Sequence, residues 1–129
     1  PQTHDAMGWQ LGDHGFEMSL ASSVPDLIAG SIRPWIKDWL GSHGLQLDEI
    51  AHWVVHPGGP RIVSAVTAGL QLPDEATAVS REVLADFGNM SSPTVLFIVE
   101  RLLQRGATGP CVMLAFGPGL VAELALLQF

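Results

Sequence analysis

Hydrophobic side chains recur every three or four positions in several stretches of the chain, which is the spacing of an amphipathic helix. The longest such stretch follows Ser22 and Ser23, and serine commonly supplies the oxygen that caps a helix start. Pro34 lies inside this stretch, so we expect the helix to be kinked or divided there, because proline lacks a backbone N–H. Shorter helices are predicted from Pro60 and from Asp74, which we expect to cap its helix.

The helix predicted from Thr94 to Gln104 differs from the others, because its apolar side chains point in every direction. Residues 95–99 are all apolar, so this part of the helix has no polar face. A helix that is apolar all round is normally buried on all sides. In a chain of 129 residues such burial requires a second layer of structure, so we expect the helix to pack against something outside the chain.

Short continuous apolar runs alternate with the helices and predict β-strands. Two runs near the start flank turn residues and predict a hairpin, and two near the end are joined by a Gly-Pro-Gly turn. The predicted strands are residues 7–11, 15–20, 51–55, 111–116 and 120–127. Their alternation with helices predicts an α/β domain with a mixed sheet and helices on both faces.

Composition supports the expectation of a missing partner. Hydrophobic residues make up 47% of the chain and charged residues only 15%, against about 25% in typical soluble domains. No apolar run approaches the roughly 20 residues of a membrane-spanning helix, and no secretion signal is recognisable. We therefore expect a cytoplasmic protein with a large buried interface and no membrane. The net charge of −7 argues against a nucleic-acid partner.

His56 is the strongest local candidate for chemistry. It directly follows the predicted strand at residues 51–55 and precedes two glycines and two prolines. Open α/β sheets bind ligands just beyond the carboxyl ends of their strands, and glycines allow a substrate to approach closely. A structural histidine in a tight turn is the alternative that the residues alone leave open.

Asn89 is the second candidate, in a Gly-Asn turn before the apolar helix. Asparagine is common in turns because it tolerates left-handed backbone angles, and the spacing alone favours that role. Its functional interpretation is an amide donor to a developing oxyanion.

Metal binding and a cysteine nucleophile are both disfavoured. His52 and His56 are four positions apart, which suits a metal on a helix, but here they flank a strand and no carboxylate accompanies them. Cys111 is the only cysteine and lies in an apolar run without a basic neighbour, so we expect a buried structural residue.

Three segments, taken in order, resemble the chalcone and stilbene synthases, which are type III polyketide synthases. They are residues 53–60 (WVVHPGGP), 80–92 (SREVLADFGNMSS) and 116–120 (FGPGL), and residues 15–25 resemble the entry into the same domain. The resemblance implies a thiolase-like fold of two similar halves, with residues 1–129 as the C-terminal half. It also implies a homodimer, and an N-terminal half of the same polypeptide that carries the nucleophilic cysteine.

The resemblance also implies the chemistry. The reaction is the decarboxylative condensation of malonyl-CoA onto a starter acyl-CoA, and these 129 residues alone are expected to be inactive. The implied catalytic residues are His56 and Asn89. The implied substrate pocket is Met18, Ser91, Phe116, Gly117 and Pro118, and the implied coenzyme contacts are Gly58, Gly59 and Arg61.

Two departures from the family pattern concern the starter pocket. Met18 stands where many plant members carry phenylalanine, and Ala115 replaces a glycine that often opens the final loop.

Other interpretations remain open at this point. A fatty-acid condensing enzyme of the ketoacyl synthase III type is also expected to use a histidine and an asparagine in its site. The Gly-Gly-Pro after His56 and the Met-Ser-Ser after Asn89 argue against this class of enzyme. A non-catalytic thiolase-like dimerisation module is the alternative outside enzymes. Arg61 as an ordinary surface residue is the alternative to a coenzyme contact.

Overall fold

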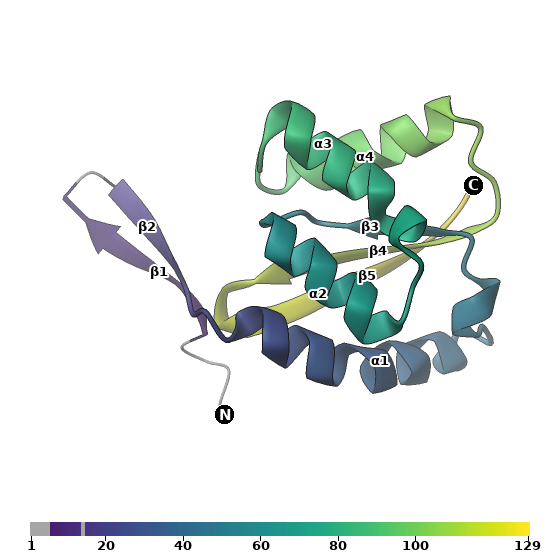
Figure 1. The fold of residues 1–129 in the computed structure, drawn as a ribbon, viewed down its shortest axis with the longest axis horizontal. Helices are drawn as coiled ribbons and strands as arrows, with labels where there is room; N and C mark the ends of the chain where they lie inside the picture. The colour runs from purple at the N-terminus through teal and green to yellow at the C-terminus, as the bar shows by residue number, and fades with distance from the viewer. Residues whose placement is uncertain (1–5, 14) are drawn as a thin grey trace.

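The first element of the fold is a hairpin that extends from the rest of the molecule (Figure 1). The computed structural model describes residues 6–13 and 15–129. Strands β1 (Met7–Gly12) and β2 (Gly15–Leu20) pair antiparallel, with Met7 opposite Leu20 and Gly12 opposite Gly15. The predicted hairpin is therefore confirmed.

A three-stranded mixed sheet forms the centre of the molecule. Strand β3 (His52–Val55) pairs parallel with β4 (Pro110–Gly117), which pairs antiparallel with β5 (Val121–Gln128). The last two strands are joined by a short 3-10 turn, η3 (Pro118–Leu120), in which Gly119 has a φ of 75°. All three strands lie close to the predicted runs, and the predicted mixed sheet is confirmed.

Four helices cover the sheet on both faces, as predicted (Figure 1). Helices α1 (Val24–Ser42) and α2 (Pro60–Leu70) pack on one face, and α3 (Ala78–Phe87) and α4 (Pro93–Gln104) pack on the other. Two 3-10 turns, η1 (Leu47–Glu49) and η2 (Asp74–Thr77), precede β3 and α3. The order of the elements therefore matches the predicted α/β domain.

Alternation along the strands divides the core between the two faces. In β3, Trp53 and Val55 join the cluster under α1 and α2, whereas Val54 joins the cluster under α3 and α4. In β4, Val112 faces the first cluster and Cys111 the second. Side chains in a strand point to opposite faces in turn, so a continuous apolar run serves a sheet that is covered on both sides.

Helices α1 and α2 approach each other closely at Gly69. A Cβ atom at Gly69 would lie 2.7 Å from Cγ2 of Ile32 and 2.9 Å from the backbone of Ala29. The φ of Gly69 is not positive, so the backbone conformation does not require a glycine at this position. Glycine is required because a side chain would have no space between the two helices. This contact holds the C-terminal end of α2 close against α1.

Three local expectations are wrong. The division of α1 expected as one possibility at Pro34 is wrong, while the alternative, a kink, stays a prediction. Buried Ile32 and Ile36 hold the turns on either side against the sheet, and Pro34 faces solvent. Asp74 does not cap a helix: it begins η2, and α3 starts after Thr77. Ser23 occupies the N-cap position of α1, but its backbone is already helical and its side chain makes no capping hydrogen bond.

Helix α4 is covered on one side only. Ile98 is fully buried against the sheet, while Leu96 is 63% exposed and Phe97 40% exposed. Phe87 and Leu103 are exposed nearby, so these residues form an apolar face on α3 and α4. Within the described residues, no helix combines the length and apolarity that a membrane crossing requires.

Candidate active site

A cavity of about 460 Å³ opens where β3 and β4 end. Its size is within the range of small-molecule sites, and its position at the carboxyl ends of parallel strands is the usual place for ligands in α/β folds. The lining residues are Met7, Val24, His56, Gly58, Ile62, Asn89, Ser91, Ser92, Val95, Ala115, Phe116, Gly117 and Pro118. The cavity therefore brings together most of the site residues that the sequence predicts.

His56 is held at the end of β3 by the backbone. Its N–H donates to the carbonyl of Leu114 at 2.8 Å, which continues the β3–β4 ladder one residue beyond the strand. The preceding N–H, of Val55, donates to Oγ of Ser80 at 3.1 Å, so α3 also anchors the strand end. The His56 side chain is half-buried, and this burial lowers its pKa because a charged imidazolium loses hydration there. The neutral imidazole is therefore favoured.

The loop after His56 leaves space beside the imidazole. The N–H of Gly58 donates to the His56 carbonyl at 3.0 Å, and Gly59 has an extended backbone that leads into α2. A Cβ atom at Gly59 would meet no other atom within 4 Å, and one at Gly58 would make only an ordinary contact with Ile62. Packing within the described residues thus does not require these glycines, which is consistent with an external molecule approaching the loop.

Asn89 uses both ends of its side chain. Its Oδ1 accepts the N–H of Ser91 at 2.9 Å, and its Nδ2 donates to the carbonyl of Gly58 at 3.4 Å, which is long for a hydrogen bond. The left-handed backbone angles of this turn belong to Gly88 and Ser91 and not to Asn89, so the conformational reason for an asparagine is wrong. Asn89 instead stabilises the turn through Oδ1, which accepts the N–H of Ser91. The Nδ2 group of its side chain is directed to the loop of His56.

The segment between Asn89 and α4 is also held by side-chain bonds. The N–H of Met90 donates to Oγ1 of buried Thr94 at 2.9 Å. This bond ties the turn to the first turn of α4, so the position of Asn89 depends on the apolar helix behind it.

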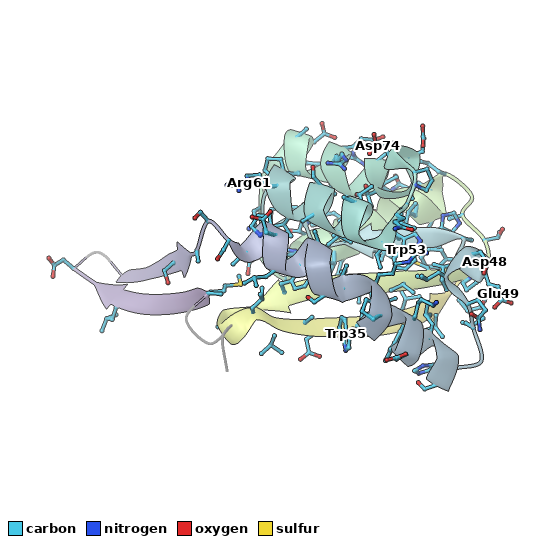
Figure 2. All side chains as sticks on the ribbon, turned by 60° about the horizontal axis from the view of Figure 1, so that its bottom comes forward. Trp35, Asp48, Glu49, Trp53, Arg61 and Asp74 are labelled. Atoms are coloured by element: carbon cyan, nitrogen blue, oxygen red, sulfur yellow. The ribbon has the colours of Figure 1, made fainter. Side chains whose placement is uncertain are left out.

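Some predicted site residues lie elsewhere. Arg61 is exposed, its Nη2 donates to the carbonyl of Ser22 at 3.3 Å, and it does not line the cavity; Figure 2 shows it at the surface. Gly59 does not line the cavity either. The backbone of Met18 pairs with Trp9 in the hairpin, but its side chain lies outside the part of the chain that is described.

Cys111 and His52 are apart from the cavity. Cys111 is fully buried in β4, where burial raises the pKa of its thiol to about 11 although a backbone hydrogen bond at Val54 acts in the other direction. A nucleophile needs its thiolate form, so Cys111 is poorly suited to that role. Nε2 of His52 lies 3.1 Å from the carbonyl oxygen of Thr108. In residues 6–13 and 15–129, no three His, Cys, Asp or Glu side chains cluster as metal ligands would.

The cavity also contains residues that sequence reasoning did not identify. Met7 enters from the base of the hairpin, Val24 and Ile62 from the first turns of α1 and α2, and Ser92 and Val95 from the start of α4. Ligand sites in α/β folds lie where the first turns of helices approach the carboxyl ends of strands. Residues at predicted helix starts could therefore have been named as candidates for the cavity lining.

Comparisons with known proteins agree with this architecture. The family model described as chalcone and stilbene synthases, C-terminal domain, matches residues 1–129. The chain is 38% identical over 132 residues to 1,3,6,8-tetrahydroxynaphthalene synthase of Streptomyces peucetius subsp. caesius, covering 100% of this chain and 35% of that protein. It is 33% identical over 125 residues to the alpha-pyrone synthesis polyketide synthase-like Pks18 of Mycobacterium tuberculosis, covering 94% of this chain and 32% of the relative.

A solved structure shows the same fold. The crystal structure of PKS-I from the brown alga Ectocarpus siliculosus superposes with a TM-score of 0.91 at 34% identity, covering 98% of this chain and 36% of that one. The fold is thus that of the thiolase-like type III polyketide synthases, and the chain spans about a third of the length of the relatives it matches. With its sequence, its sheet and its cavity all in agreement, the chain belongs to the chalcone and stilbene synthase family, whose C-terminal domain it matches from end to end.

Proposed function

We propose that the whole protein condenses malonyl-CoA with a starter acyl-CoA and that this chain supplies two hydrogen-bond donors for the reaction. The observation that carries the proposal is the shared cavity: His56 at the end of β3 and Asn89 before α4 line the same space. Family membership supports the reaction class, since the matching relatives are polyketide synthases.

The two donors act on charge that develops during decarboxylation. Malonyl-CoA loses carbon dioxide, and the electron pair of the broken C–C bond forms an enolate whose negative charge rests on the thioester oxygen. An N–H of His56 and an Nδ2–H of Asn89 stabilise this oxygen. A neutral imidazole carries one N–H, so the lowered pKa of His56 is compatible with this role. Removing one such donor typically costs about 2.7–4 kcal/mol of transition-state stabilisation.

The nucleophile comes from the N-terminal half of the same polypeptide. A cysteine thiolate there attacks the carbonyl of the starter thioester and releases coenzyme A as its thiolate, which takes up a proton. An imidazolium form of His56 beside that thiolate lowers the cysteine pKa, and the thiolate charge in turn opposes the effect of burial on His56. The enolate then attacks the cysteine-bound acyl group, forms the new C–C bond and returns the thiolate.

The apolar face of α3 and α4 is the surface proposed to pack against that N-terminal half. Phe87 and Phe97 lie with their ring centroids 5.5 Å apart, and the guanidinium carbon of Arg101 lies 5.8 Å from the Phe87 ring centroid. Exposed aromatic and aliphatic groups in one place indicate an interface. In the whole protein we further propose a homodimer.

The test is the loading and condensation activity of the full-length protein beside that of these 129 residues. The full-length protein is expected to take the acyl group of a starter acyl-CoA onto a cysteine other than Cys111, located by mass spectrometry, and to release carbon dioxide from malonyl-CoA. The isolated 129 residues are expected to do neither. Turnover by the isolated chain, or acylation of Cys111, would contradict the proposal.

A further inference from the structure

We propose that the buried hydroxyl groups of Ser80 and Thr94 are positioning groups for the two donors of the site. Ser80 acts through His56, and Thr94 acts through Asn89. Neither Ser80 nor Thr94 lines the cavity, so neither is expected to touch the substrate. The inference rests on the proposed function and deepens it, because it names the residues that hold the two donors in place for the reaction.

The polar side chains that are buried in the described part of the chain divide into two pairs. They are Thr67, Thr77, Ser80 and Thr94. A buried hydroxyl costs free energy unless it is hydrogen-bonded, so each of them needs a partner. Thr67 and Thr77 bond to each other, with their Oγ1 atoms 2.8 Å apart. Ser80 and Thr94 bond instead to the backbone beside the site.

Ser80 satisfies the outer edge of β3. On the inner side β3 pairs with β4, where the N–H of His56 donates to the carbonyl of Leu114 at 2.8 Å. Successive N–H groups of a strand point to opposite sides, so the N–H of Val55 points away from β4. Oγ of Ser80 accepts this N–H at 3.1 Å, and both residues are fully buried. The strand end that carries His56 is therefore attached to β4 on one side and to α3 on the other.

Thr94 has the same relation to Asn89. Its Oγ1 accepts the N–H of Met90, the residue after Asn89, at 2.9 Å. Thr94 is fully buried in the first turn of α4, where a valine would fill the same space and leave this N–H without an acceptor. A backbone N–H that loses its acceptor away from water is costly, so the turn that carries Asn89 is expected to shift until it finds another partner.

Helix α3 connects the two attachments. Ser80 lies in its first turn, and Asn89 follows its end by two positions. Nδ2 of Asn89 reaches back to the carbonyl of Gly58 at 3.4 Å, so both ends of α3 contact the segment that carries His56. Figure 1 shows α3 beside α4 on the same face of the sheet. The placement of α3 against β3 and α4 therefore sets the distance between the two donors.

The proposed reaction is sensitive to small shifts because both donors act on one oxygen atom. A displacement of about 1 Å at a reacting group can cost about 100-fold in rate. A strand end or turn that keeps its other hydrogen bonds shifts less than this. We therefore expect the loss of either hydroxyl to lower the rate about tenfold.

The experiment measures carbon dioxide release from malonyl-CoA by the full-length protein. Ser80→Ala and Thr94→Val are each expected to lower kcat about tenfold and to leave KM close to the wild-type value, because neither residue lines the cavity. Thr94→Ser keeps the hydroxyl and is expected to keep most of the wild-type kcat. If Ser80→Ala does not fold, Ser80→Cys is used and is expected to show a smaller loss, since a thiol is a weaker acceptor.

Thr77→Val is the matched control. It removes a hydroxyl that is as fully buried as those of Ser80 and Thr94, but whose partner is Thr67. It is expected to be destabilised to urea unfolding to a similar extent as Ser80→Ala and to keep the wild-type kcat. An equal loss of kcat in Thr77→Val would mean that any buried hydroxyl of this region has the effect, and it would overturn the inference.

Double variants show which donor each hydroxyl acts through. Combined with His56→Ala, which leaves no donor to misplace, Ser80→Ala is expected to lower kcat little further. Combined with Asn89→Asp, Ser80→Ala is expected to keep its full effect. Thr94→Val is expected to show the reverse pattern. Equal effects of either hydroxyl in the two backgrounds overturn the inference.

Failure of the proposed function gives a different result. A wild type that releases no carbon dioxide, or that keeps its rate in His56→Ala and Asn89→Asp, refutes the proposed function. A wild type that depends on both donors but keeps its rate in Ser80→Ala and Thr94→Val overturns this inference alone.

Discussion

At the scale of single residues, the two ends of the Asn89 side chain have different tasks. Oδ1 closes the turn by accepting the N–H of Ser91, whereas Nδ2 is directed to the loop of His56 and makes only a long contact there. An aspartate at this position keeps the acceptor and loses the donor. The fold and the proposed chemistry can therefore be separated by a change at one atom.

Asn89→Asp is accordingly expected to leave the free energy of unfolding close to that of the wild type. Asn89→Ala removes the acceptor as well and is expected to lower stability by about 1 kcal/mol, the usual contribution of one hydrogen bond. Urea unfolding of both variants measures the difference. Equal losses in the two variants would contradict the assigned role of Oδ1.

Burial of His56 predicts a pH effect on stability. Its folded pKa lies below the ordinary value of 6.5, so the unfolded chain takes up a proton more readily than the folded one. The contribution of His56 is therefore lost as pH falls through about 6.5 toward the lower folded pKa. His56→Gln is expected to lose less stability than the wild type between about pH 7 and pH 5.

The control for this pH effect is His43→Gln, because His43 is exposed near the end of α1. Its unfolding curves measure the effect of replacing a histidine that lies outside the cavity. If His56→Gln shows the wild-type dependence, the burial of the imidazole is not coupled to its protonation.

The sequence allowed His56 and Asn89 to be selected as candidates, but for different reasons. The position of His56 at the end of an apolar strand indicated a functional residue directly. The spacing of Asn89 favoured a turn residue, and only the family resemblance indicated a catalytic role for it. The contributions of Val24 and Ile62 to the cavity could not be predicted, because they depend on where two helix starts lie in space.

At the scale of elements, packing decides the details that local signals leave open. The expected division of α1 at Pro34 did not occur because Ile32 and Ile36 are both buried against the same face. The expected cap at Asp74 depended on backbone angles that no residue pattern determines. The strands and the helix starts at Val24 and Pro60 were predictable, since apolar runs and proline positions directly reflect burial and backbone geometry.

The contact between α1 and α2 gives a prediction at this scale. Gly69→Ala is expected to lower the free energy of unfolding by about 1–3 kcal/mol, because the added Cβ overlaps Ile32 and the backbone of Ala29. Gly30→Ala is the matched control, since a Cβ atom there meets nothing within 4 Å and alanine favours the helix. Thermal or urea unfolding measures both. A neutral Gly69→Ala would mean that the helices separate without cost.

At the scale of the whole molecule, a missing N-terminal half would explain both the apolar composition of the chain and the exposed apolar face of α4. A chain with 47% hydrophobic residues keeps Leu96, Phe97 and Leu103 exposed on one side. In the proposed whole protein the N-terminal half covers them. In isolation these 129 residues have only copies of themselves to cover that face.

We therefore expect the isolated chain to self-associate through α4. Leu96→Glu is expected to lower the average mass measured by light scattering at high concentration, because a charge in an apolar interface loses its hydration. Leu11→Glu changes a leucine on the hairpin that is 80% exposed, against 63% for Leu96, and it is expected to leave the mass unchanged. A monodisperse monomer of the unmodified chain would rule out this interpretation of the face.

The central claim is that His56 and Asn89 together stabilise the charge formed when malonyl-CoA loses carbon dioxide. The most direct measurement is the rate of carbon dioxide release from malonyl-CoA by the full-length protein carrying His56→Gln or Asn89→Asp, with His43→Gln as the control. The account predicts that each site variant loses about 100-fold to 1000-fold in rate while the control keeps the wild-type rate. Release at the wild-type rate by either site variant would contradict the account.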